Sequence, residues 1–194
     1  MTSSPQARVT RVYLARHGRT ALNAEDRLRG LSDPPLDDVG LAEVQRLGKA
    51  LAPFAPVQVF SSPLQRAVST AEAIATAAGI STRTDQRLND RDYGPNTGEL
   101  RSEVIARYGS VDAAPGVESL AALTARARAA FDELVAENAT GPLVLVSHNA
   151  FNRALLGTID PALVNVEQRT ACWNQLSLVD GSWRVDLYDQ KPAG

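Results

Sequence analysis

The sequence predicts an α/β protein, a three-layer α/β/α sandwich whose central sheet is mostly parallel, with a C-terminal antiparallel hairpin strand. Short apolar runs typical of buried strands alternate with longer segments whose apolar residues recur at helical spacing, which favours a sheet covered by helices. Near the C-terminus, Asp180-Gly181 separates two strand-like stretches, a pattern typical of a hairpin. With 194 residues, 44% of them hydrophobic, the chain can bury one sizeable core, so we expect a single domain over residues 9–190.

Each expected element has its own signal. Asp37 or Asp38 can cap a helix, and the serines before Pro63 indicate another helix start. The stretch 21–35 is rich in turn residues and is expected to be irregular, lying over the strand ends. The expected strands are residues 9–15, 57–60, 80–84, 143–146, 172–179 and 183–188, and the expected helices are residues 38–52, 61–78, 102–108 and 119–138, with one more after His148. Two helices carry apolar stripes expected to face the core, Val39, Val44, Leu47 and Leu51 in the first and Leu120, Leu123, Ala127, Phe131 and Leu134 in the long one.

Composition excludes several classes of protein. A net charge of −2 argues against a binder of nucleic acid or anionic membrane, whose electrostatic footprint is basic. The one cysteine, Cys172, excludes an internal disulfide and a cysteine-rich metal site, which favours a reducing, cytoplasmic setting. Residues 1–8 are polar and lack the apolar core of a signal peptide, so we expect a disordered tail. No run approaches the roughly 18 apolar residues of a membrane span.

Arginine and histidine residues follow three of the expected strands. Arg16 and His17 come directly after the first strand. Arg66 lies near the start of the helix after the second, and His148 follows the strand at 143–146. In open α/β sheets, ligands bind beyond the carboxyl ends of the strands. An ordinary surface loop with solvated arginines also fits the first of these segments taken alone.

These residue types suit a phosphomonoester dianion. Arg16 and Arg66 can make bidentate contacts with its non-bridging oxygens. His17 is the candidate nucleophile, because a neutral imidazole nitrogen is available near pH 7 and can form a phosphohistidine that water later hydrolyses. Gly18 and Asn23 would allow close backbone approach and supply an amide donor.

The remaining chemistry needs no cofactor. A protonated His148 would add positive charge at the same phosphate oxygens. Two distant histidines and one cysteine do not make a zinc site, and the arginines make a metal unnecessary, although a carboxylate-only magnesium site stays open. The sequence lacks the P-loop, the dinucleotide-binding fingerprint and the G-x-S-x-G elbow.

Over nearly its whole length the chain resembles the histidine phosphatase superfamily, also called phosphoglycerate mutase-like. The segments that carry the resemblance are Arg16-His-Gly-Arg-Thr20 with Asn23, Gly30 with Asp33-Pro-Pro-Leu36, Ser61-Ser-Pro-Leu-Gln-Arg66-Ala67 with Thr70-Ala-Glu72, Leu88-Asn-Asp-Arg-Asp-Tyr-Gly94, Gly116-Val-Glu-Ser-Leu120, and Val146-Ser-His148 with Arg153-Ala-Leu-Leu156. The resemblance implies that His17 is the phosphorylated nucleophile. It also implies a phosphate pocket made by Arg16, Asn23, Arg66 and His148, and places Asp90 where the family has its proton donor.

Three positions depart from the family pattern. Arg19 stands where Glu or Gln is usual. It either adds positive charge near the entrance, which would favour a multiply anionic substrate, or it is a solvated surface arginine. Asp90 replaces a usual Glu, so its loop must approach the phosphate about 1.5 Å more closely or a water must bridge. Asn149 replaces the Gly that usually follows the second histidine, and its backbone N–H remains a possible phosphate donor. If Asp90 is structural, Asp92 or Glu99 is the alternative acid.

The choice within the family rests on a short segment. Residues 88–94 resemble the mutases, but only 27 residues separate Asp90 from Glu118, and the long basic insertion of the mutases has no counterpart. We therefore expect a phosphatase acting on small phosphorylated metabolites, with a phosphoglycerate mutase as the alternative and a non-catalytic phosphate-binding or docking module as a third. The expected partner is a small metabolite, with neither nucleic acid nor membrane, and a homodimer stays open.

Overall fold

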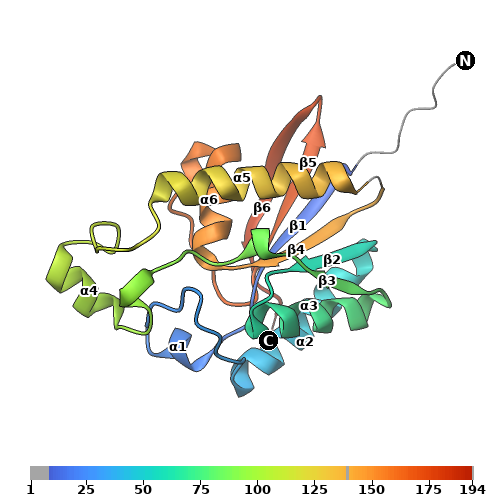
Figure 1. Ribbon diagram of the computed structural model, residues 1–194. Coiled ribbons are helices and arrows are strands. Elements are labelled where there is room, and N and C mark those ends of the chain that lie inside the picture. The colour runs from blue at the N-terminus through green and yellow to red at the C-terminus, as the bar shows by residue number, and fades with distance from the viewer. Residues whose placement is uncertain (1–8, 139, 194) are drawn as a thin grey trace, which may run out of the picture.

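The computed structural model describes residues 9–138 and 140–193, and these form one six-stranded sheet with helices on both faces (Figure 1). The strand order is β3-β2-β4-β1-β5-β6. Strands β1, β2, β3 and β4 run parallel, whereas β5 is antiparallel to β1 and pairs with β6 in a hairpin. The predicted fold class is confirmed. The tail expected at residues 1–8 lies outside the described residues.

The elements follow the predicted order along the chain. The strands are β1 (Arg11–Arg16), β2 (Gln58–Ser61), β3 (Thr82–Thr84), β4 (Leu143–Ser147), β5 (Trp173–Val179) and β6 (Ser182–Gln190). The helices are α1 (Ala21–Ala24), α2 (Asp38–Leu51), α3 (Gln65–Ala78), α4 (Arg101–Tyr108), α5 (Leu120–Glu137) and α6 (Asn149–Ile159). Short 3₁₀ turns lie at Ala52–Phe54, Gln86–Leu88, Gly94–Asn96 and Pro161–Leu163.

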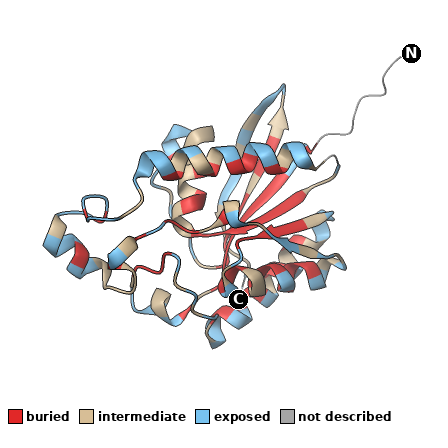
Figure 2. Ribbon diagram, in the orientation of Figure 1, coloured by how far each residue is buried: buried red, intermediate tan, exposed pale blue. Residues whose placement is uncertain are grey.

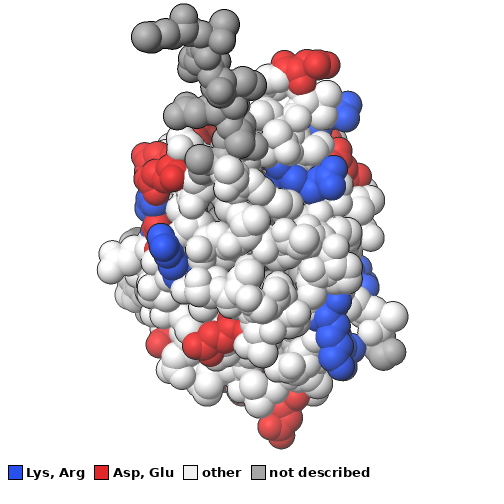
Figure 3. Space-filling view, turned by 90° about the vertical axis from the view of Figure 1, so that its right-hand side faces the viewer, with Lys and Arg blue, Asp and Glu red and all other residues white. Residues whose placement is uncertain are grey.

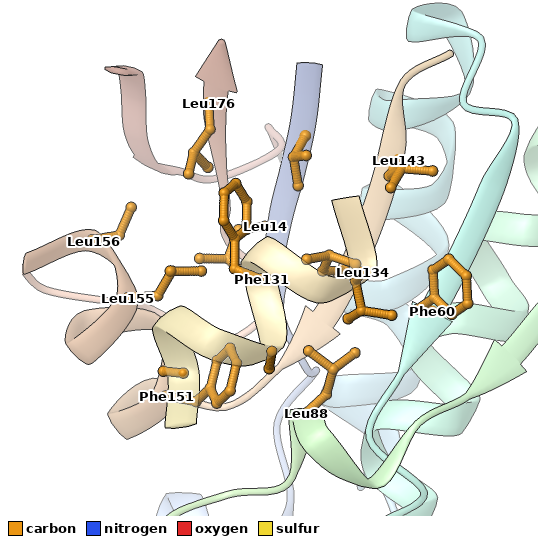
Figure 4. Packing of buried hydrophobic residues seen from close by; sticks show 14 of the residues in the cluster. Leu14, Phe60, Leu88, Phe131, Leu134, Leu143, Phe151, Leu155, Leu156 and Leu176 are labelled. Atoms are coloured by element: carbon orange, nitrogen blue, oxygen red, sulfur yellow. The ribbon is translucent and has the colours of Figure 1, made fainter. Parts of the chain in front are cut away.

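Two apolar layers hold the helices to the sheet. On one face, α5 and α6 pack on the sheet through Phe131, Leu134 and Phe151, and Figure 4 shows these side chains with Leu143 of β4. Leu145 of β4 belongs to the same cluster. On the other face, α2 and α3 cover Val144 and Val146 of the same strand, among other residues. Because successive side chains of a strand point to opposite faces, β4 is buried along its whole length, which explains its uninterrupted apolar run (Figure 2).

Four expectations about the helices are wrong in detail. The helix expected from residue 61 begins at Gln65 as α3, and its N-cap is Leu64 rather than a serine before Pro63. The stretch 21–35 is not wholly irregular, since Thr20 and Asn23 form a capping box that starts the four-residue helix α1. Val39 and Leu120 do not join the core stripes: each lies in the first turn of its helix and remains about half exposed, at 43% and 51%. The other stripe residues are buried.

The parallel strands end on the side of the molecule where α1 and α4 lie, at the left of Figure 1. Figure 3 shows the opposite side, where acidic and basic side chains are scattered among uncharged residues. Cys172 is buried, and no helix among the described residues is long and apolar enough to cross a membrane.

Candidate active site

The candidate site lies at the carboxyl ends of three adjacent strands, β2, β4 and β1. We call its five members the histidine pocket: Arg16, His17, Arg66, Asp90 and His148. Four of them lie at the ends of these strands or just after them, whereas Asp90 comes from the loop that follows β3 and the 3₁₀ turn Gln86–Leu88. All are at least 92% buried, and the rings of His17 and His148 lie 5.1 Å apart between centroids. The sheet topology therefore brings together the five residues that the sequence predicted as catalytic.

His17 is held in one tautomer by its own chain. Its Nδ1 lies 2.6 Å from the carbonyl oxygen of Gly18, which can only accept, so Nδ1 carries the proton and Nε2 the lone pair. Nε2 is buried and has no hydrogen-bond partner among the described residues. Burial lowers the pKa of His17 well below its usual value, and the positive charge of Arg66 lowers it further. The imidazole is therefore neutral at pH 7, with a nucleophilic nitrogen facing the pocket.

Arg66 lies in the first turn of α3, and two main-chain carbonyls of the loop at residues 30–32 hold its guanidinium. Its Nη1 donates to Ser32 O at 2.7 Å and its Nη2 to Gly30 O at 2.8 Å. Nη2 also lies 3.3 Å from Oδ2 of Asp90, and Nε is buried with no partner among the described residues. Thr70, one helical turn further along α3, donates to Arg66 O at 2.6 Å and accepts from the Gly18 N–H at 3.1 Å. The arginine and the loop that carries His17 are thus tied to each other.

Arg16 is anchored from the other side of the site. Its Nη1 donates to the carbonyl oxygen of Gln168, whose side chain exchanges two 2.8 Å hydrogen bonds with Asn174 of β5. Asn174 also donates to Leu14 O at 2.8 Å, so the hairpin braces the end of β1. Burial lowers the pKa of Arg16 to about 10, and the nearby Arg29 contributes to the shift. The guanidinium remains charged at pH 7.

His148 is the N-cap of α6, and the N-terminus of this helix faces the pocket. Helix N-termini favour anions, because unpaired N–H groups and the helix dipole both point toward them. Burial lowers the pKa of His148 well below its usual value, and Arg66 adds to this effect, so His148 is neutral in this structure. A bound phosphate dianion would act in the opposite direction and favour the protonated His148 considered from the sequence.

Of the three candidate acids, Asp90 is the one that is buried in the histidine pocket. Its Oδ2 is 3.8 Å from His148 Nδ1, and its Oδ1 accepts from the Arg91 N–H at 2.8 Å. By contrast, Asp92 is exposed and accepts from the Gly94 N–H, and Glu99 pairs with Arg107 at 2.9 Å. Arg126 donates to Asp90 O at 2.8 Å and so holds the loop in place.

Gly18 and Asn23 both help to hold the loop that carries His17. The Gly18 N–H is used by Thr70, and a Cβ at this position would lie 2.7 Å from Val44 Cγ1. A Cβ on Gly40 of α2 would overlap the carbonyl oxygen of Arg19. Gly18 is therefore required where the loop packs on α2, and its N–H is not available to a phosphate. Asn23 uses Oδ1 in the capping box, which leaves Nδ2 as the end that can donate to a ligand.

A profile of the histidine phosphatase superfamily (branch 1) matches residues 12–191. The chain belongs to this family. An uncharacterized phosphatase PhoE from Bacillus subtilis is 29% identical over 184 residues, which cover 93% of this chain and 95% of that one. A probable phosphoglycerate mutase GpmB from Yersinia pestis is 32% identical over 182 residues, covering 87% and 84%. A mycobacterial glucosyl-3-phosphoglycerate phosphatase, solved with VO3, superposes with a TM-score of 0.86 at 27% identity and covers 94% of this chain and 100% of that one.

One further buried arginine, Arg29, was not predicted from the sequence. Arg29 is 6% exposed, its Nη1 donates to Arg27 O at 2.9 Å, and its Nε has no partner among the described residues. Its charge contributes to the lowered pKa of Arg16 and His17, so it lies within electrostatic reach of the pocket. The only sequence signal for it is a charged residue directly before Gly30, inside a stretch without periodicity.

A cavity of about 330 Å³ adjoins the histidine pocket at Arg16, and we call it the arginine cavity. It is lined by Arg16, Arg19, Asn23, Asp26, Arg29, Arg101, Asn149, Arg153 and Thr170. Arg19 pairs with Asp37 at 2.9 Å, so it is a paired arginine at the cavity wall.

Among the described residues, no group of three or more histidine, cysteine or acidic side chains could hold a metal ion.

Proposed function

We propose that this histidine phosphatase hydrolyses small phosphomonoesters through a phosphohistidine formed on His17. The observation that carries the proposal is the state of this imidazole, which is neutral, fixed by the Gly18 carbonyl and directed by Nε2 into a pocket with two guanidiniums. A neutral nucleophile surrounded by fixed cations is what transfer from a phosphate dianion requires.

In the first half-reaction, Nε2 of His17 attacks phosphorus and the bond to the ester oxygen breaks. The carboxyl group of Asp90 gives its proton to the departing oxygen, so an alcohol leaves and a phosphohistidine remains. Arg16 and Arg66 hold the non-bridging oxygens, and the N-terminus of α6 at His148 and Asn149 faces the same anion.

In the second half-reaction, the Asp90 carboxylate takes a proton from water while the water oxygen attacks phosphorus. The N–P bond breaks, inorganic phosphate leaves, and both His17 and the protonated Asp90 are restored. The distances from Asp90 to Arg66 and His148 support this double role, because they place its carboxyl group beside the groups that hold the phosphate.

A phosphoglycerate mutase is the second candidate, and the 32% identical GpmB relative favours it. A mutase must retain its phosphorylated intermediate while the substrate reorients. Only 27 residues lie between Asp90 and Glu118, and they contain the short helix α4 rather than a long basic insertion. This supports hydrolysis over isomerisation.

The test is rapid quench with labelled phosphomonoesters. We expect an acid-labile, base-stable adduct that is absent from His17→Ala, together with a loss of turnover of about 10⁴ or more. Normal turnover by folded His17→Ala would contradict the proposal. With 3-phosphoglycerate and bisphosphoglycerate present, isomerisation faster than phosphate release would instead identify a mutase, and phosphate binding without turnover of any ester would identify a docking module.

A further inference from the structure

The arginine cavity carries more positive charge than one phosphate needs. Five of the residues that line it are arginines, and Asp26 is the one acidic residue among them. This contrasts with the opposite side of the molecule, where charges of both signs are dispersed (Figure 3). A one-sign cluster inside a concave surface attracts anions, because the low-dielectric walls concentrate its field.

Three of the five arginines have no carboxylate partner among the described residues. Arg19 pairs with Asp37 at 2.9 Å and Arg101 with Asp26 at 3.4 Å. The other three, Arg16, Arg29 and Arg153, donate to the uncharged oxygens of Gln168, Arg27 and Asn165 respectively. Nε of each of these three is buried and has no partner among the described residues.

The charge balance divides four arginines, Arg66 of the histidine pocket and the three without a carboxylate partner in the described part of the chain, into two pairs. Arg16 and Arg66 bind the phosphate in the proposed function, and a phosphate dianion carries two negative charges. Arg29 and Arg153 then remain without an anion, although Arg29 is 94% buried and a buried guanidinium is costly without one. A second anionic group on the substrate would neutralise them.

A second cavity, of about 370 Å³, leads away from these arginines. It shares Arg101, Asn149 and Arg153 with the arginine cavity, and its other walls include the apolar side chains of Tyr93, Ile105, Leu123 and Val164. The two cavities therefore share a wall that includes Arg153, and the second provides a partly apolar space beside the arginine cavity.

We propose that the substrate is a phosphomonoester whose leaving group carries a second anionic group, a carboxylate or a second phosphate, bound by Arg29 and Arg153. This inference rests on the proposed function. It makes Arg29 and Arg153 specificity-determining residues, while Arg16 and Arg66 serve the reacting phosphate.

The test compares matched esters. 3-Phosphoglycerate and glycerol 3-phosphate have the same carbon skeleton and differ in a carboxylate against a hydroxymethyl group, and propanediol bisphosphate against propanediol monophosphate makes the same comparison for a second phosphate. In at least one pair, we expect kcat/KM to be about tenfold or more higher for the ester with the second anionic group, mainly through a lower KM. The pair that shows the preference identifies the kind of anion.

In Arg153→Gln and Arg29→Gln we expect this preference to fall about tenfold, whereas the control Arg128→Gln, on the outer part of α5 and paired with Asp132, should keep it. Arg153→Gln is the safer variant because Arg153 is only partly buried. Equal kcat/KM within both pairs for the wild type, or a preference unchanged in both folded variants, would overturn the inference while phosphohistidine formation still supported the proposed function. Absence of any phosphohistidine would overturn both.

Discussion

The histidine pocket and the arginine cavity lie side by side, yet their cations are held in different ways. In the pocket, Arg16 and Arg66 donate to main-chain carbonyls that the fold itself fixes. In the cavity, Arg19 and Arg101 pair with the carboxylates of Asp37 and Asp26, and Arg153 donates to the side-chain oxygen of Asn165. Arg29 is the exception in the cavity, because it donates to the main-chain carbonyl of Arg27. The main-chain acceptors of Arg16 and Arg66 are fixed by the fold, whereas the side-chain partners of Arg19, Arg101 and Arg153 can be substituted one at a time. We therefore expect substitutions in the pocket to abolish chemistry and substitutions in the cavity to change the substrate.

The largest effect that sharpens this comparison is expected for Arg66→Lys. An ammonium keeps the charge but cannot donate to two carbonyls and a phosphate in the same planar arrangement. Activity should fall by about 10² to 10³, the usual cost of one transition-state contact. The measurement is kcat/KM with one phosphomonoester, with Arg128→Lys as a control that should stay near wild type. Near wild-type kinetics for Arg66→Lys would break the distinction between the two regions.

A smaller and substrate-dependent effect is expected for Asp90→Asn. An alkoxide needs a proton as it leaves, but p-nitrophenolate departs almost unaided. Formation of the phosphohistidine should therefore slow about 10²-fold or more with an alkyl phosphate and far less with p-nitrophenyl phosphate. Single-turnover measurements on both substrates check this. Equal losses would make Asp90 structural and would turn attention to Asp92 or Glu99.

The buried histidines should also make the folded state sensitive to acid. The pKa values of His17 and His148 lie well below 6.5 in the folded chain, so the unfolded chain binds more protons between those values and 6.5. Stability is therefore fully present above pH 6.5 and falls as the pH decreases through this window, by up to about 1.4 kcal/mol per pH unit for each histidine. Urea unfolding at pH 7.5 and 5.5 measures the effect. The double variant His17→Gln/His148→Gln should show a weaker dependence, and an identical one would show that other groups cause it.

The smallest effect is expected from a chelator. Because Arg16 and Arg66 supply the positive charge in the proposed mechanism, an excess of EDTA should leave the rate unchanged. Complete loss of activity that magnesium or zinc restores would mean that the pocket has been interpreted incorrectly.

Periodicity and strand ends predicted the parts of this molecule that depend on local pattern. The apolar runs located β1, β2 and β4, and the residues after them meet because parallel strands end at one edge. The exposure of Val39 and Leu120 could not be predicted from periodicity. Apolar residues at helical spacing can extend into a first turn that lies beyond the edge of the core. Arg29 was missed for a different reason: its burial depends on loops that meet only in the folded chain.

Because the His17 loop packs closely on α2, the site also depends on a residue that has no functional group, Gly40. Gly40 carries no side chain and lies on a helix remote in sequence from every candidate catalytic residue, yet one added methyl group would overlap the main chain at Arg19. A variant such as Gly40→Ala would displace the nucleophile while leaving every polar residue of the histidine pocket intact. In a mutational survey such a position would score like a catalytic residue, and only the backbone explains why.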